Sequence, residues 1–99
     1  MAVKKTVESF EVIRARVCAT IAMDLELDGV DLRVFLYLNS RLGFDTFTHV
    51  PQIELATMLG RRKEHISRSI RALIAAGVLV PGDRGPRASE WRLNPDYGN

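Results

Sequence analysis

The order of elements in the second half of the chain restricts the fold most: two helices joined at a glycine, followed by a hairpin. In residues 62–76, apolar side chains recur at helical spacing and define one stripe along a helix. These apolar residues are Ile66, Ile70, Leu73 and Ile74. Gly77 follows them, and glycine ends a helix at little cost because it enters the left-handed region freely. We therefore predict a helix over about 62–76 with one side packed on a core.

A shorter helix is predicted just before it, over residues 51–59. Pro51 suits a first helical turn, and Leu55, Ala56 and Leu59 have helical spacing. Gly60 then allows a left-handed turn, and the next helix begins only a few residues later. The two segments therefore predict a helix-turn-helix.

A β-hairpin is predicted after the second helix. Val78–Val80 is short, branched and apolar, and Ser89–Leu93 alternates so that Trp91 and Leu93 share one face. The residues between these strands, 81–88, are rich in Gly and Pro and predict an irregular loop. Phe47–Val50 is a further short strand that is expected to join this sheet. The predicted fold class is mainly α with a small β-sheet.

The outward side of the 62–76 helix combines cations with hydrogen-bonding side chains. Its residues are Lys63, Glu64, His65, Ser67, Arg68 and Arg71. Cations neutralise phosphates, while the other side chains match the donors and acceptors of base edges. A solvated helix face more often alternates acids and bases at four-residue spacing, and here acids are nearly absent. This pattern favours contact with DNA.

The charge of the chain is unevenly distributed. Residues 60–92 contain eight Lys and Arg against three Asp and Glu, a net charge of +5. Residues 1–59 contain six against eight, a net charge of −2, and Asp96 completes the total of +2. A basic end on a mildly acidic body is expected to orient the molecule on a polyanion.

Several motifs follow one another in the order of a known superfamily: Arg33–Leu38, Leu55-Ala56, Leu59-Gly60, Ile66-Ser67-Arg68, Gly77-Val78-Leu79 and Trp91–Pro95. Over roughly residues 28–95 the chain resembles the winged helix-turn-helix superfamily, in particular MarR-like regulators and, more narrowly, RepL-like plasmid replication proteins. The resemblance implies a recognition helix in the major groove and a basic wing at 81–88. The implied groove residues are Lys63, Glu64, His65, Ser67 and Arg68, with Arg71 toward the backbone and Arg84 and Arg87 in the wing.

The chain departs from this superfamily where the recognition helix begins. Ser or Thr usually stands there, whereas this chain has Arg61-Arg62. An arginine cannot accept the first amide hydrogens of the helix as an N-cap oxygen does. A phosphate oxygen could accept them, which suits DNA binding and adds both arginines to the predicted contact residues.

The first 27 residues are treated as a separate N-terminal segment that precedes the DNA-binding domain at 28–99. We predict a strand at Phe10–Arg14 and a helix at Cys18–Leu25. The alternative is one long helix, since Phe10, Ile13, Val17 and Ile21 also have helical spacing.

The next predicted helix runs from Asp28 to Leu42, with Asp28 and Asp31 as its capping residues. It is apolar nearly all round, so it needs a second cover from the N-terminal segment or from another copy. A homodimer is therefore expected, and with it a palindromic or directly repeated DNA site.

Other classes of function have little support in the sequence. Cys18 is the single cysteine, and His49 and His65 lack metal-ligand spacing with it, so we expect no metal or cofactor. Gly82 and Gly85 lack the ending of a phosphate-binding loop. No apolar stretch reaches the length of a membrane span and no signal peptide is visible, so a cytoplasmic protein is expected. No enzyme is predicted.

Two hypotheses for function remain. The first is sequence-specific binding of double-stranded DNA, as a transcriptional repressor or a plasmid replication, partition or copy-control factor. The second is a winged-helix module that binds a protein partner in a replication or segregation complex. Protein interfaces have aromatic and apolar anchors at their centres, and the arginine-rich helix face exposes none. The first hypothesis is therefore favoured.

Overall fold

The computed structural model describes residues 9–99. This part is mainly helical, with a small antiparallel sheet, as the sequence predicts. Its elements are α1 (Phe10–Ala22), α2 (Gly29–Arg41), β1 (Thr48–His49), α3 (Gln52–Leu59), α4 (Lys63–Ala76), β2 (Leu79–Pro81), a 3-10 turn η1 (Pro86–Ala88) and β3 (Glu90–Leu93).

Helix α1 corrects the prediction for the N-terminal segment. The expected strand at Phe10–Arg14 is wrong, and the helix ends at Ala22 rather than Leu25. The alternative of one continuous helix is the right one. Ile13, Val17 and Ile21 all point into the core, and burial of this stripe of three residues spaced four apart outweighs the strand tendency of the branched residues. Residues 1–8 of the predicted N-terminal segment lie outside the described residues.

Helix α2 begins at the capping residues that the sequence predicts. The Asp31 amide donates to the Asp28 carboxylate (2.9 Å), and the Asp28 amide donates to the Asp31 carboxylate (3.1 Å). Val34, Phe35 and Leu38 are buried on its inner side. The helix is not covered all round, however, because Leu36 on its outer side stays 63% exposed.

The strands form one sheet with the order β1-β3-β2. Thr48 pairs with Trp91 and Leu79 pairs with Leu93, so the predicted Phe47–Val50 strand joins the hairpin, through Thr48–His49. Trp91 and Leu93 share the buried face as expected. The indole Nε1 of Trp91 donates to the carbonyl of Val50 (3.0 Å), which satisfies its one polar group inside the core.

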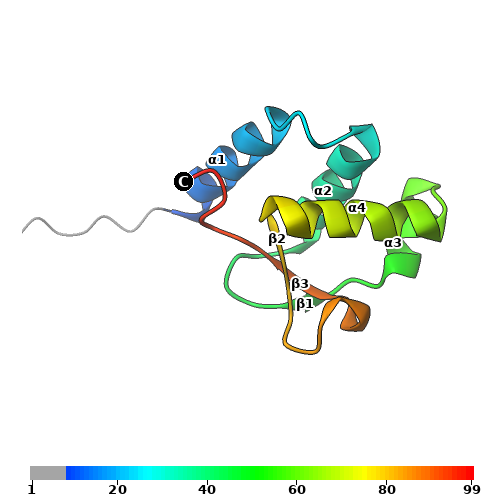
Figure 1. Cartoon of the computed structure of the whole chain (residues 1–99). Coiled ribbons are helices and arrows are strands. Elements are labelled where there is room, and N and C mark those ends of the chain that lie inside the picture. Colours follow the sequence, from blue (N-terminus) through cyan, green and yellow to red (C-terminus); the bar gives the residue numbers. More distant parts are fainter. Residues whose placement is uncertain (1–8) are drawn as a thin grey trace, which may run out of the picture.

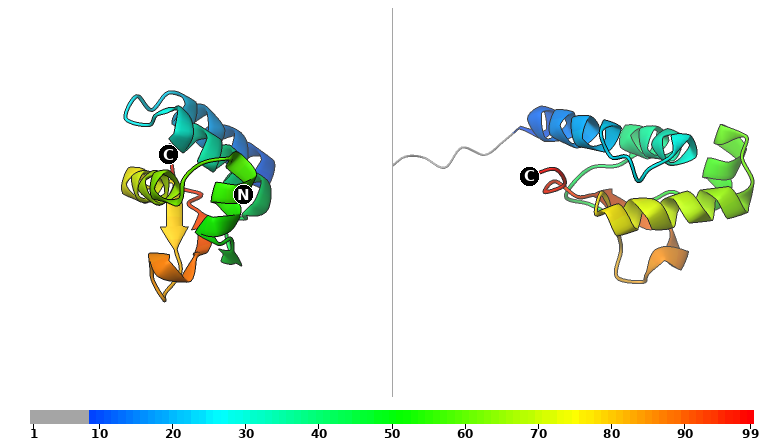
Figure 2. Two further views of the ribbon diagram at one scale, coloured as in Figure 1. Left: turned by 90° about the vertical axis from the view of Figure 1, so that its right-hand side faces the viewer. Right: turned by 45° about the horizontal axis from the view of Figure 1, so that its top comes forward.

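The core lies between α2, α4 and the sheet, and α1 closes it on one side (Figure 1). The segment after β3 runs back along α1, where the Arg16 guanidinium donates to the Pro95 carbonyl (2.6 Å). The hairpin loop (82–89) projects on the opposite side of α4 from α1, as Figure 2 shows. Helix α1 and the hairpin loop therefore lie at opposite ends of the molecule, with α4 between them.

Candidate functional site

Two glycines fix the direction of α3 and α4. Gly60 has φ 63° and ψ 37°, and Gly77 has φ 89°, so both end their helices in the left-handed region, as predicted. The Arg61 amide donates to the Ala56 carbonyl across the first of these turns (3.0 Å). A residue with a Cβ would be strained at either glycine. The turn at Gly60 allows α4 to begin at Lys63, close to the start of α3.

Helix α4 is divided into a buried and an open side. Ile66, Ile70 and Leu73 are almost fully buried, as the apolar stripe predicts, and Ile74 is partly buried beside them. Ser69 was not part of the predicted stripe, yet it is also buried. The open side carries the predicted polar residues. Lys63, Glu64, Arg68 and Arg71 are exposed, and His65 and Ser67 are half-buried.

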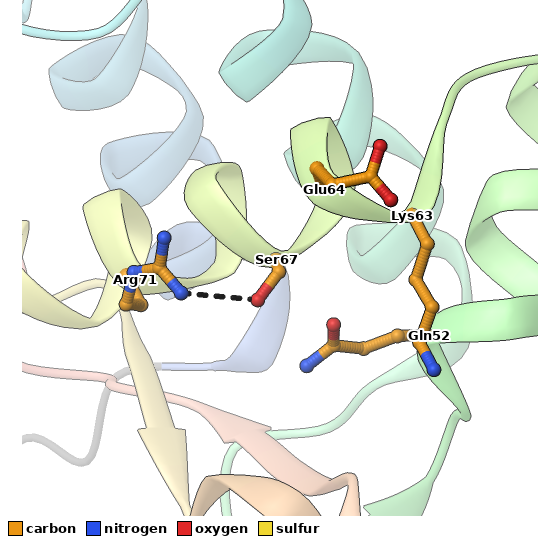
Figure 3. Close-up of a pocket in the computed structure, with 5 residues that line it drawn as sticks. All are labelled: Gln52, Lys63, Glu64, Ser67 and Arg71. Carbon is orange, nitrogen blue, oxygen red and sulfur yellow. Dashed lines mark hydrogen bonds between the residues drawn. The ribbon is translucent and has the colours of Figure 1, made fainter.

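An open hollow of about 320 Å³ lies where the beginnings of α3 and α4 meet (Figure 3). It is lined by Gln52 from α3 and by Lys63, Glu64, Ser67 and Arg71 from α4. The Arg71 guanidinium donates to the Ser67 hydroxyl (3.1 Å), which holds the arginine along the helix. Four of the sequence-predicted residues are thus brought together.

A second hollow of about 370 Å³ joins this surface to the hairpin loop. It shares three residues with the first hollow and adds Arg87 and Ser89 from the loop. The shared residues are Gln52, Lys63 and Ser67. We call the residues of α3, α4 and the loop that line the two hollows the cationic groove.

Gln52 was missed by the sequence analysis, although it lines both hollows. Its only signal in the sequence is its place as a polar residue after Pro51 at the start of a short helix. That signal gains meaning only once the crossing of α3 and α4 is known, because the crossing places Gln52 beside Lys63.

The structure leaves other predicted residues outside the two hollows. Arg61 and Arg62 are exposed in the turn between the helices. Arg68 is exposed nearer to α2: the pKa of the Asp28 carboxyl is lowered first by the Asp31 amide hydrogen bond, and in addition by the charge of Arg68. His65 is half-buried and does not line either hollow.

The loop arginine Arg84 is engaged within the protein. Its Nε donates to Oε1 of Glu90 (3.1 Å), and its Nη2 lies 3.1 Å from Oε2 of the same carboxylate. This hydrogen bond lowers the pKa of the Glu90 carboxyl. Of the two predicted loop arginines, only Arg87 therefore reaches the groove without an acidic partner that the structure shows.

Neither helix that borders the groove is capped by a side chain. The N-cap residues are Pro51 for α3 and Arg62 for α4, and neither makes a side-chain hydrogen bond to the first turn. The missing cap at Arg62 agrees with the departure noted in the sequence. Since Gln52 and Lys63 are the first residues of the two helices, both positive helix ends border the same groove.

Not every Lys or Arg of residues 60–92 contributes to the cationic groove. The guanidinium of Arg92 donates to the Phe44 carbonyl (3.1 Å) and lies 5.6 Å from the centre of the Phe47 ring. It therefore holds the 44–47 loop against β3. By composition, Arg92 contributes to the net charge of +5 of residues 60–92. In the structure its guanidinium instead contacts the Phe44 carbonyl and the Phe47 ring.

Comparisons with protein-family models, with curated proteins and with solved structures find no match to this chain. Among residues 9–99 no helix is both long and apolar enough to cross a membrane. The same residues contain no group of three or more His, Cys, Asp or Glu side chains placed to hold a metal ion. Function must therefore be inferred from the arrangement of the groove itself.

Proposed function

We propose that α3, α4 and the hairpin form a winged helix-turn-helix that binds double-stranded DNA. In this proposal α4 is the recognition helix and enters the major groove, which admits one α-helix. The hairpin loop is the wing and reaches the neighbouring phosphate backbone or minor groove through Arg87.

The observation that carries the proposal is the composition of the cationic groove. Lys63, Arg71 and Arg87 supply positive charge from two separate elements, and Gln52 and Ser67 supply neutral hydrogen-bonding groups between them. Phosphates are bound by cations and by helix N-termini, while amide and hydroxyl groups read base edges. The groove offers all of these groups on one surface.

The uncapped N-termini of α3 and α4 are a second observation that favours a phosphate-bearing ligand. The first-turn amides of a helix need an acceptor, and elsewhere in this chain a side chain provides it. At α3 and α4 a phosphate oxygen can take that place, with the helix dipole favouring the negative charge.

A protein partner fits the groove less well. The centre of a protein interface is usually formed by aromatic and apolar anchors. Ile53 is the single large apolar residue among those lining the two hollows. Within DNA binding, roles as a repressor or as a plasmid replication, partition or copy-control factor all require this same contact.

The test is the salt dependence of binding to duplexes selected from a random pool. Affinity measured by fluorescence anisotropy should fall with salt, with a log–log slope of about −0.9 for each phosphate contacted. Combining Lys63→Ala with Arg87→Ala should make the slope shallower by roughly 1.8 if each cation meets one phosphate.

Combining Arg33→Ala with Arg41→Ala is the matched control, because it also removes two exposed positive charges, and neither arginine lines the groove. It should leave the slope unchanged. Binding that is indifferent to salt, or failure to bind any duplex in dilute buffer, would overturn the proposal.

A further inference from the structure

Ser89, at the end of the hairpin loop, is the only residue other than glycine among residues 9–99 whose φ is positive (56°). Left-handed backbone is uncommon for a residue with a Cβ, and strain of this kind clusters at binding sites. The Ser89 amide donates to the Pro86 carbonyl (3.2 Å), and its carbonyl accepts from the Val50 amide (2.9 Å), which holds the conformation. Because glycine would adopt this conformation without strain, we expect the serine side chain itself to have a role.

The Ser89 side chain is enclosed but unpaired. The residue is only 8% exposed, and it lines the hollow of about 370 Å³ between the hairpin loop and the starts of α3 and α4. Within residues 9–99 its hydroxyl makes no hydrogen bond. The Ser67 hydroxyl in the same groove, by contrast, accepts from the Arg71 guanidinium (3.1 Å). A hydroxyl that is largely removed from water costs free energy until it finds a partner, so Ser89 is suited to a ligand that enters the hollow.

The start of α3 brings unpaired amides to the same hollow. The amides of Glu54 and Leu55 both donate to the Pro51 carbonyl (3.0 and 3.3 Å). The two amides before them, those of Gln52 and Ile53, have no acceptor among the described residues, and both residues line the hollow. Open amides at a helix N-terminus bind anions, and the helix dipole favours the negative charge.

The charged side chains around the hollow select the same kind of ligand. Lys63 from α4 and Arg87 from the hairpin loop line it, and none of the residues that line it is acidic. A phosphate group carries negative charge on oxygens that accept several hydrogen bonds at once. Amides, a hydroxyl and two cations around one hollow therefore match a phosphate.

We propose that the Ser89 hydroxyl donates to a phosphate oxygen of the DNA backbone that enters this hollow at the start of α3. The left-handed backbone of Ser89 brings the hydroxyl to that position. Glycine would suit the backbone better but would leave the phosphate without this donor. The inference rests on the proposed function and adds a contact residue to it. Since serine carries no charge, the distribution of cations in the sequence gives no indication of this contact.

The experiment measures DNA affinity and stability for two substitutions of Ser89 in the full chain. Ser89→Gly removes the hydroxyl and relieves the strain, whereas Ser89→Ala removes the hydroxyl and keeps the strain. Both variants should bind the selected duplex about five- to tenfold more weakly in fluorescence anisotropy, as expected for the loss of one hydrogen bond to a charged group. Only Ser89→Gly should melt at a higher temperature than the wild type. Ser40→Ala, which removes an exposed hydroxyl on α2, should leave affinity unchanged.

Methylphosphonate substitution in the duplex then locates the contacted phosphate. It replaces one charged phosphate oxygen by a methyl group, at one backbone position at a time. At one position the wild type should lose more affinity than the two Ser89 variants, because the variants already lack the contact. Ser89 variants that bind as tightly as the wild type, or that lose as much as the wild type at every position, would overturn the inference and leave the proposed function intact. A wild type that binds no duplex would overturn both.

Discussion

The four described helices fall into two pairs that differ at their N-termini. Helices α1 and α2 are capped by their own side chains, through Ser9 and Asp28. The N-cap residues of helices α3 and α4 are Pro51 and Arg62, and neither provides a side-chain cap. The capped pair lies on the side of the molecule away from the hairpin loop (Figures 1 and 2), and the uncapped pair borders the cationic groove.

The two pairs use one property of the helix backbone in two ways. Every helix start has amides without an intrahelical acceptor. A side-chain oxygen that accepts them stabilises the fold, whereas leaving them open costs stability and keeps a place for an anion. In this protein the stabilising caps lie in the scaffold and the open ends lie at the proposed DNA surface.

Among tests of the uncapped pair, the largest expected effect is the loss of DNA affinity on substitution of Arg68. Arg68 lies outside the two hollows but is exposed on α4, so a recognition helix in the major groove would still present it to the bases. We expect Arg68→Ala to weaken binding to a selected site by about 1–3 kcal/mol and to relax base preference, because an arginine in the major groove commonly bonds guanine. Arg87→Ala should instead weaken selected and random duplexes equally. Competition binding with both kinds of duplex measures the difference. Loss of discrimination in the Arg87 variant alone would reverse the two roles.

A smaller effect is expected from removing a cap in the other pair. Asp28→Ala should lower the free energy of unfolding by about 0.5–2 kcal/mol, without changing the DNA affinity of the folded protein. Thermal or urea unfolding and anisotropy measure the two quantities. A large loss of DNA affinity in the folded variant would show that α2 belongs to the binding surface.

The contribution of Asp28 should also depend on pH. Hydrogen bonding to the Asp31 amide lowers the pKa of this carboxyl in the folded state. The stabilisation is therefore present above its unfolded pKa of about 4 and is lost as the pH falls through the lower folded value. The stability difference between wild type and Asp28→Ala should shrink in that acidic window.

Adding a cap to α4 should move stability and binding in opposite directions. Arg62→Ser supplies a side-chain oxygen for the first-turn amides, so the free energy of unfolding should rise by about 0.5–1 kcal/mol. DNA affinity should fall, because a cation is lost and the amides are already satisfied. If the variant is more stable and binds DNA as tightly as the wild type, the uncapped end has no part in binding.

The smallest expected effect concerns the Arg84–Glu90 pair. Glu90→Gln removes the carboxylate that holds Arg84 and makes the hairpin loop more positive, so DNA affinity should increase by about two- to fivefold. The gain should disappear at high salt, since it is electrostatic. Glu26→Gln, an exposed carboxylate in the 23–28 loop, is the control that should leave affinity unchanged. An unchanged affinity in the Glu90 variant would mean that Arg84 takes no part.

Much of the second half of the fold could be predicted because its signals are local. Gly60 and Gly77 end their helices where the sequence places them, and the spacing of the apolar residues assigns the buried side of α4. The alternation of Trp91 and Leu93 likewise assigns the buried face of β3. Each of these features depends on a backbone preference or a period that is contained in a short stretch of chain.

The first helix could not be assigned in this way. Phe10–Arg14 contains aromatic and branched residues that favour a strand, while the wider spacing favours a helix. Burial of Ile13, Val17 and Ile21 in the core that they share with residues of α2, α4 and the sheet decides the matter. That information lies in residues distant along the chain.

The sequence by itself determined three of the four described helices, the glycine turns, the hairpin and the concentration of cations at one end of the chain. Only the tertiary structure decided which of those cations share a surface. Arg84, Arg87 and Arg92 are equivalent by composition, yet one is paired with Glu90, one lines the groove and one packs on Phe47. Charge is a property of a residue, but its availability depends on neighbours that the chain brings together only when it folds.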